Sequence, residues 1–164
     1  MGQQRRVAAP FTMTSPAFGL GEPIPARHTC DGDNDSPALL WTAPPAGTRS
    51  LAIAMEDPDA PSGEFVHWLG WGLDPRLRGL PEAVEPPFEG RNDFGRVGYA
   101  GPCPPIGHPP HEYVFRLFAL GMPPDFPPGS RMDDLREFLA EELIEATELT
   151  GTYVRPPRRV QGTP

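Results

Sequence analysis

The stretch "HEYVFRLFAL" (111–120) comes directly after "AGPCPPIGHPP" (100–110), and the two stretches differ in character. In the later stretch one set of alternate positions consists of His111, Tyr113, Phe115 and Leu117. Alternate residues of an extended chain face the same side, so this pattern predicts a β-strand over 111–120. The earlier stretch contains five prolines and two glycines. Proline fixes φ and removes an amide donor, so the predicted strand is entered through a stiff loop.

Two further strands are predicted earlier in the chain. "RSLAIAMED" (49–57) is almost continuously apolar, which is typical of a strand buried on both faces. It ends at the Pro/Gly/Asp cluster "DPDAPSG". "FVHWLGWGLD" (65–74) predicts a strand. The residues expected on one face of that strand are His67, Leu69, Trp71 and Leu73.

The segment "SRMDDLREFLAEELIEATELTG" (130–151) has helical periodicity. Its apolar residues at that spacing are Leu135, Phe138, Leu139, Leu143 and Ala146. Asp133 and Asp134 suit the positive N-terminal end of a helix, and Gly151 stops the pattern. Strands followed by one late helix favour a mainly β protein, an antiparallel β-sandwich, over alternating βαβ units.

Length and composition exclude several classes of protein. The chain has 164 residues, which predicts one domain, taken as 11–155 with loose tails at 1–10 and 156–164. A net charge of −8 argues against nucleic-acid binding, which needs a basic face. No apolar stretch approaches the roughly 18 residues of a membrane span, and the N-terminus does not resemble a signal peptide. We therefore expect a cytoplasmic protein, either monomer or homodimer, without stable membrane insertion.

The two cysteines, Cys30 and Cys103, are too far apart in sequence for a CxxC motif. A disulfide could join them, but a reducing cytoplasm disfavours it. Free cysteines are usually buried, so we expect two small buried residues.

Polar residues gather at the entries to two predicted strands. In "MEDPDAPSGEFVHW" (55–68), Asp57 and Asp59 lie in a turn before His67. Prolines follow both aspartates closely, and the Ala60–Pro61 bond is a candidate for the cis form. If 65–74 and 111–120 belong to one sheet, His67 and His111 lie at one end of a hydrophobic core. Taken singly, however, a D-x-D pair is commonly only a turn, and a histidine at a strand start is commonly a packed residue.

The motifs together resemble the phosphatidylethanolamine-binding protein family, in particular its bacterial and archaeal branch, often called Raf kinase inhibitor-like. The resemblance is carried, in order, by "HTCDGDNDSPALLW" (28–41), "DPDAPSGEFVHW" (57–68), "GRNDFGRVGYAGPCPP" (90–105), "HEYVFRLFAL" (111–120) and "LTGTYVR" (149–155). It implies a sandwich of two antiparallel sheets with a few peripheral helices. It also implies a small pocket near one end of the central sheet for an anion such as phosphate or a phospholipid head group.

The ligand-binding residues expected from this resemblance and from the loop chemistry are Asp57, Asp59, Phe65, His67, Gly101, Cys103, Pro104, Pro105, His111 and Tyr113. The chain departs from relatives before "GTY", where Glu141 and Glu142 stand in a stretch that often carries a Gly-His pair. We also expect no counterpart of the C-terminal helix of animal relatives after Arg155. A more open pocket follows, and regulation of a kinase cascade is not carried over.

A physical hypothesis explains how an acidic protein could bind an anion. The aspartates serve the histidines, because a neighbouring carboxylate favours imidazolium and orients the ring. A cationic His67 or His111 then donates to the anion, Tyr113 adds a neutral donor, and affinity fades above about pH 7. Backbone donors would come from Gly101, Cys103, Ile106 or Gly107, since proline has none.

Four functions remain open, and a binding protein without a cofactor, a metal or catalytic residues is favoured. A hydrolase could use Asp57 or Asp59 with His67 as general base, but there is no G-x-S-x-G motif. Cys103 could be a thiolate nucleophile, although its proline neighbours indicate a rigid wall. A zinc site of Asp57, Asp59, His67 and His111 has suitable ligands but no supporting spacing. A protein-interaction module, such as a protease or kinase inhibitor, is the last alternative.

Overall fold

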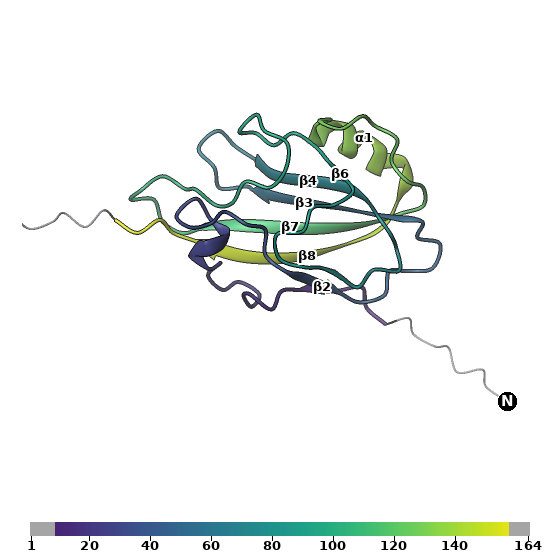
Figure 1. The fold of residues 1–164 in the computed structure, drawn as a ribbon, viewed down its shortest axis with the longest axis horizontal. Coiled ribbons are helices and arrows are strands. Elements are labelled where there is room, and N and C mark those ends of the chain that lie inside the picture. Colours follow the sequence, from purple (N-terminus) through teal and green to yellow (C-terminus); the bar gives the residue numbers. More distant parts are fainter. Residues whose placement is uncertain (1–8, 158–164) are drawn as a thin grey trace, which may run out of the picture.

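The computed structural model describes residues 9–157, which form two antiparallel sheets and one α-helix. The predicted mainly β, two-sheet antiparallel sandwich is therefore confirmed (Figure 1). The larger sheet has the strand order β6-β4-β3-β7-β8, and its strands are β3 (Ser50–Asp57), β4 (Phe65–Leu73), β6 (Phe88–Glu89), β7 (His111–Leu120) and β8 (Leu143–Tyr153). The smaller sheet has the order β1-β2-β5, with β1 (Met13–Thr14), β2 (Leu39–Trp41) and β5 (Gly79–Leu80). The helices are the 3-10 turn η1 (Ala26–His28) and α1 (Met132–Glu142). Most of the predicted tails, 1–10 and 156–164, lies outside the described residues.

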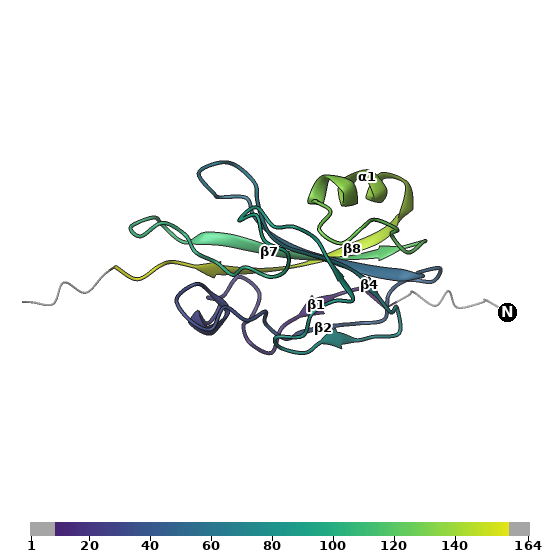
Figure 2. The same ribbon diagram turned by 45° about the horizontal axis from the view of Figure 1, so that its top comes forward.

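Strand β3 is the centre of the molecule, and every one of its residues is buried. One of its faces, with Ile53 and Met55, packs in the core between the two sheets against residues such as Leu39. The other face, with Ala54, packs under α1 against Leu135. Figure 2 shows α1 on one side of the large sheet and the strands β1 and β2 on the other. The strand buried on both faces and the bounds predicted for 111–120 are confirmed.

The second half of the predicted helix is a strand. Helix α1 ends at Glu142, and Leu143–Tyr153 forms β8, which pairs with β7 along its whole length. Leu, Glu and Ala favour helices locally, but the ladder with β7, which one register shift near Leu120 interrupts, supplies backbone partners and overrides that propensity. Gly151 therefore stands inside a strand opposite Tyr113 and ends no helix.

The alternation predicted for β4 is also wrong, because two register shifts interrupt its pairing with β3. Leu69 and Trp71 face α1, whereas Trp68 and Leu73 pack between the sheets. At the register shift opposite Leu51–Ile53, Gly72 has φ +79°, a backbone conformation that residues with a Cβ rarely adopt.

Candidate functional site

A cavity of about 300 Å³ opens where β3 ends and where β4 and β7 begin. Antiparallel pairing brings these strand ends together, since Asp57 pairs with Phe65 and Glu56 pairs with Val114. The lining residues are Asp57, Ala60, Pro61, Ser62, Phe65, His67, Phe94, Cys103, Pro104, Pro105, His111 and Tyr113. The two imidazoles thus share one cavity and one sheet, but they are not on adjacent strands, because β3 lies between β4 and β7.

A β-bulge places His67 at the cavity. Met55 pairs with Trp68 and Glu56 pairs with Val66, so His67 is the extra residue of β4 and has no partner in β3. Bulges redirect side chains and are frequent beside functional sites. Here the His67 ring centroid lies 5.0 Å from that of Phe65 and 5.4 Å from that of Tyr113.

Asp57 is paired with His111 inside the protein. Oδ2 of Asp57 lies 2.7 Å from Nδ1 of His111, and both side chains are almost fully buried. The second carboxylate oxygen of Asp57 accepts a hydrogen bond from the Asp59 amide at 2.8 Å. On the far side of the His111 ring, Nε2 lies 3.3 Å from Nδ1 of His108. The geometry is the carboxylate–imidazole pair of the physical hypothesis, extended by a second imidazole.

His67 has a different environment. Its Nδ1 lies 2.6 Å from the carbonyl oxygen of Ala100, which can only accept, so Nδ1 carries the proton. Burial lowers the pKa of His67, and this effect exceeds the opposing effects of the Ala100 carbonyl and the Asp57 carboxylate. His67 is therefore neutral at pH 7, which argues against the expected imidazolium at this position. Of the two histidines, only His111 has a direct carboxylate partner.

Tyr113 supplies the most unusual group of the cavity. Its side chain is fully buried, and its hydroxyl is the one buried side-chain polar atom in residues 9–157 without a hydrogen-bond partner. Burial, together with the nearby carboxylates of Asp57 and Asp59, raises the pKa of the phenol. The hydroxyl is therefore protonated at neutral pH, and it can donate to a ligand.

Two predicted site residues do not line the cavity. Oδ2 of Asp59 accepts a hydrogen bond from the Glu112 amide at 2.8 Å, which ties the turn after β3 to the start of β7. The Gly101 amide donates to Oδ1 of Asn34 at 2.7 Å, so it is not free for a ligand. A Cβ at position 101 would overlap the His28 carbonyl oxygen, so close packing explains this glycine.

Phe94 is a cavity residue that the sequence reasoning missed. It comes from the loop between β6 and β7, where no periodicity marks it. Its ring centroid lies 4.7 Å from that of Phe65, and the two rings form an apolar wall beside His67.

The two cysteines form a disulfide, with their Cα atoms 5.4 Å apart, so the expectation of two free buried residues is wrong. Both are partly exposed rather than buried. The fold brings together two loops that are distant in sequence, which spacing alone could not show. The Ala60–Pro61 bond, a candidate for the cis form, is trans, as are all described peptide bonds.

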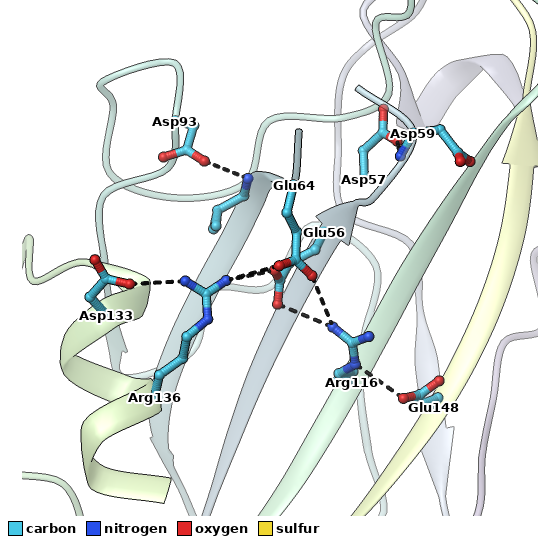
Figure 3. Close-up of polar contacts among 10 residues, drawn as sticks. Glu56, Asp57, Asp59, Glu64, Asp93, Arg116, Asp133, Arg136 and Glu148 are labelled. Atoms are coloured by element: carbon cyan, nitrogen blue, oxygen red, sulfur yellow. Dashed lines mark hydrogen bonds and ion pairs between the residues drawn. The ribbon is translucent and has the colours of Figure 1, made fainter. Parts of the chain in front are cut away.

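The residue before Asp57 points to the opposite face of the sheet. Glu56 is buried there and contacts the guanidinium groups of Arg116 at 3.2 Å and of Arg136 at 3.0 Å (Figure 3). Burial and the neighbouring Glu64 carboxyl raise the pKa of Glu56, against the opposing effect of the two arginines. This cluster joins α1 to the sheet, and it is separate from the cavity.

Within residues 9–157, no group of three or more His, Cys, Asp or Glu side chains is arranged to hold a metal ion. The helices described in the same range are too short or too polar to cross a membrane.

Comparison with known proteins agrees with this fold. Residues 14–154 match the phosphatidylethanolamine-binding protein family. A UPF0098 protein of Pyrococcus abyssi is 40% identical over 150 residues, which cover 86% of this chain and 84% of the relative. A Mycobacterium tuberculosis protein named as a candidate lipoprotein, LppC, is 38% identical over 148 residues, covering 89% of this chain and 73% of the relative. The crystal structure of Escherichia coli YbcL, described as a member of the mammalian PEBP family, has a TM-score of 0.83 and 32% identity, covering 90% of this chain and 99% of YbcL. The chain therefore belongs to the phosphatidylethanolamine-binding protein family.

Proposed function

We propose that this protein binds a small anion, either phosphate or a phosphorylated head group, in the cavity between His67, His111 and Tyr113. The observation that carries the proposal is the buried Tyr113 hydroxyl, which has no partner among residues 9–157. An unsatisfied buried polar group costs about 1–3 kcal/mol, a cost that a bound acceptor would remove. The cavity that it borders, at about 300 Å³, is at the lower end of the range for small-molecule sites.

The carboxylates at the cavity already have partners, which lowers their opposition to an anion. Asp57 is the one carboxylate among the lining residues, and it is already paired with His111. Asp59 is outside the lining and engages a backbone amide. An entering anion therefore meets imidazole and hydroxyl groups, and the nearest carboxylate has its own partner.

The walls are apolar and already in place. Phe65 and Phe94 form one side, and prolines 61, 104 and 105 contribute elsewhere. Proline-rich walls lose little conformational entropy on binding, which favours affinity. The apolar surface suits a head group that carries an organic part beyond its phosphate.

The enzyme alternative receives less support. Cys103 is committed to the disulfide, so in this state it offers no thiolate nucleophile. Ser62 lines the cavity, but it has no hydrogen bond to a histidine among the described residues. We infer a binding protein without catalytic residues; the interaction module and the choice between monomer and homodimer stay predictions. The cytoplasmic location also stays a prediction, and the disulfide, typical of oxidising compartments, weighs against it.

Calorimetric titration with inorganic phosphate and with O-phosphorylethanolamine tests the proposal. We expect binding of both, and we expect Tyr113→Phe to weaken it about 5- to 10-fold, the value of one net hydrogen bond of about 1–1.4 kcal/mol. Tyr153→Phe is the matched control, because the Tyr153 hydroxyl bonds to Asp31 and lies outside the cavity.

The pH dependence gives a second arm of this test. Because burial lowers the pKa of His67, its ring gains a proton only below its ordinary range near 6.5. Anion affinity should therefore rise as the pH falls below about 6.5, where the bound anion stabilises the imidazolium. The oxidised wild-type protein should be titrated at about pH 5.5 and about pH 7.5, which lie on either side of the ordinary histidine pKa. If it binds no phosphate at either pH, the proposed function is rejected.

A further inference from the structure

We propose that the Cys30–Cys103 disulfide is a redox-sensitive clamp that holds one wall of the anion cavity in its binding position. The inference rests on the proposed function and adds a regulatory element to the same site. Reduction of the disulfide is expected to weaken anion binding while the β-sandwich stays folded.

The wall contributed by residues 103–110 is otherwise almost untied. Within residues 9–157, none of its backbone groups forms a hydrogen bond with another segment, and the one backbone bond inside it runs from the His108 amide to the Pro105 carbonyl at 3.2 Å. Four of its residues are prolines, which have no amide donor. The side-chain contact between His108 and His111 joins only its end to the following strand. The disulfide is therefore its one covalent tie to a distant part of the fold.

The other end of the disulfide is firmly held. Cys30 follows η1 directly after His28 and Thr29, which are both fully buried. Nδ1 of His28 lies 2.9 Å from the Asp35 carbonyl oxygen, and the Thr29 hydroxyl donates to the Ala26 carbonyl at 2.7 Å. The Cys30 amide donates to the Pro102 carbonyl at 3.1 Å, just before the untied wall begins. A rigid anchor is thus joined to a segment that lacks its own backbone partners.

The wall belongs directly to the cavity. Cys103, Pro104 and Pro105 are consecutive lining residues of the same cavity as Phe65 and Phe94. Proline restricts φ, but it does not fix where the segment lies relative to the sheet. Pro104 is buried against the fold, and the Cys30–Cys103 bond is the one covalent tie, so the position of this wall depends on that bond together with the packing of Pro104.

The chemistry is thiol–disulfide exchange. The thiolate of a dithiol reductant attacks one sulfur, the S–S bond breaks, and a mixed disulfide forms. The second thiol of the reductant then displaces the remaining protein sulfur, so the protein gains two electrons and two protons and the dithiol becomes a disulfide. Both cysteines are partly exposed, so a reductant can reach them. Neither lies in a strand or in the hydrophobic core, so cleavage leaves the packing of the sheets intact.

The test compares oxidised wild-type protein, the same protein in dithiothreitol, and the Cys30→Ser variant, which breaks the bond without changing a lining residue. Inorganic phosphate is titrated by calorimetry, and urea unfolding reports the stability of the fold. We expect the dissociation constant for phosphate to rise at least tenfold in dithiothreitol and in Cys30→Ser. Reoxidation should restore the wild-type value, and dithiothreitol should not change the variant further. Equal phosphate affinity in both redox states, with only a lower urea midpoint, would show a purely structural disulfide and overturn the proposal.

A second readout does not need a ligand. The ¹⁵N order parameter of the Cys103 amide should fall from about 0.85 to below about 0.6 on reduction, while that of Val114 in β7 should stay high. An unchanged Cys103 value also overturns the clamp. If the oxidised protein binds no phosphate, the proposed function fails, and the clamp is judged by the order parameters alone.

Discussion

Replacing Asp57 with Asn tests the central pair of the cavity at nearly constant shape. In the Asp57→Asn variant the side-chain carbonyl oxygen can still accept the hydrogen bond from the Asp59 amide, which Asp57 receives at 2.8 Å. The change affects the 2.7 Å contact to Nδ1 of His111, where a charged acceptor is replaced by an amide that can donate. His111 must then present a lone pair at Nδ1 and carry its proton at Nε2.

The expected cost follows from this exchange. A hydrogen bond to a charged group contributes about 1.5–3 kcal/mol, and the neutral bond that replaces it contributes about 1 kcal/mol, which leaves a loss of about 0.5–2 kcal/mol. The larger cost of about 3–5 kcal/mol for an abandoned buried charge does not apply, because the amide of the variant can still form a hydrogen bond with Nδ1 of a neutral His111 tautomer. Phosphate affinity should fall about tenfold, since charge-assisted hydrogen bonds are about twice as strong as neutral ones.

Urea unfolding followed by tryptophan fluorescence measures the stability of Asp57→Asn without reductant, and calorimetry measures its phosphate affinity. The matched control is Asp59→Asn, at an exposed side chain that lies outside the cavity, and this variant keeps an acceptor for the Glu112 amide. We expect the control to lie within about 0.5 kcal/mol of wild type, as for most surface substitutions, with unchanged affinity. If both variants lose stability and affinity to the same extent, the Asp57–His111 pair neither stabilises the fold nor supports anion binding in the way its geometry implies.

Two further variants test the polar groups on either side of the large sheet. Tyr113→Phe should raise the free energy of unfolding by about 1 kcal/mol, because it removes a buried hydroxyl that has no partner among residues 9–157. A clear loss of stability in urea unfolding would mean that the hydroxyl has a hydrogen-bond partner. For Glu56, the pKa of the folded state is raised by burial, so the folded state holds the proton more tightly than the unfolded one. Stability should therefore fall as the pH rises from about 4.5 through the raised pKa, and Glu56→Gln should reduce this slope. Glu148→Gln is the control, because Glu148 also contacts Arg116 but its side chain is 55% exposed, and this variant should keep the wild-type pH slope. Equal pH slopes in wild type and Glu56→Gln would contradict the reasoning.

Local sequence patterns were sufficient to predict several strands of the large sheet. Continuous apolar character predicted β3 as buried on both faces, and alternation predicted the bounds of β7. Such strands can be recognised from a short stretch of sequence, because burial of a central strand requires apolar residues along its length. Local propensity failed at β8, where helix-forming residues pair with β7, because the ladder stabilises an extended chain more than propensity favours a helix.

For the cavity, the sequence predicted the candidate groups: two aspartates, two histidines, a tyrosine and a proline-rich wall. Which of these groups line the cavity, and which partners they have, depends on contacts that form in the folded chain. The bulge that redirects His67 depends on the pairing of β4 with β3, and Phe94 and the Cys30–Cys103 bond depend on loops that meet only in the folded chain. The folded structure also excludes Asp59 and Gly101 from the cavity lining, because their polar groups form hydrogen bonds with other segments. Hydrogen bonds and disulfides form between groups that are close in space, and closeness in space between distant segments is set by the packing of the whole chain.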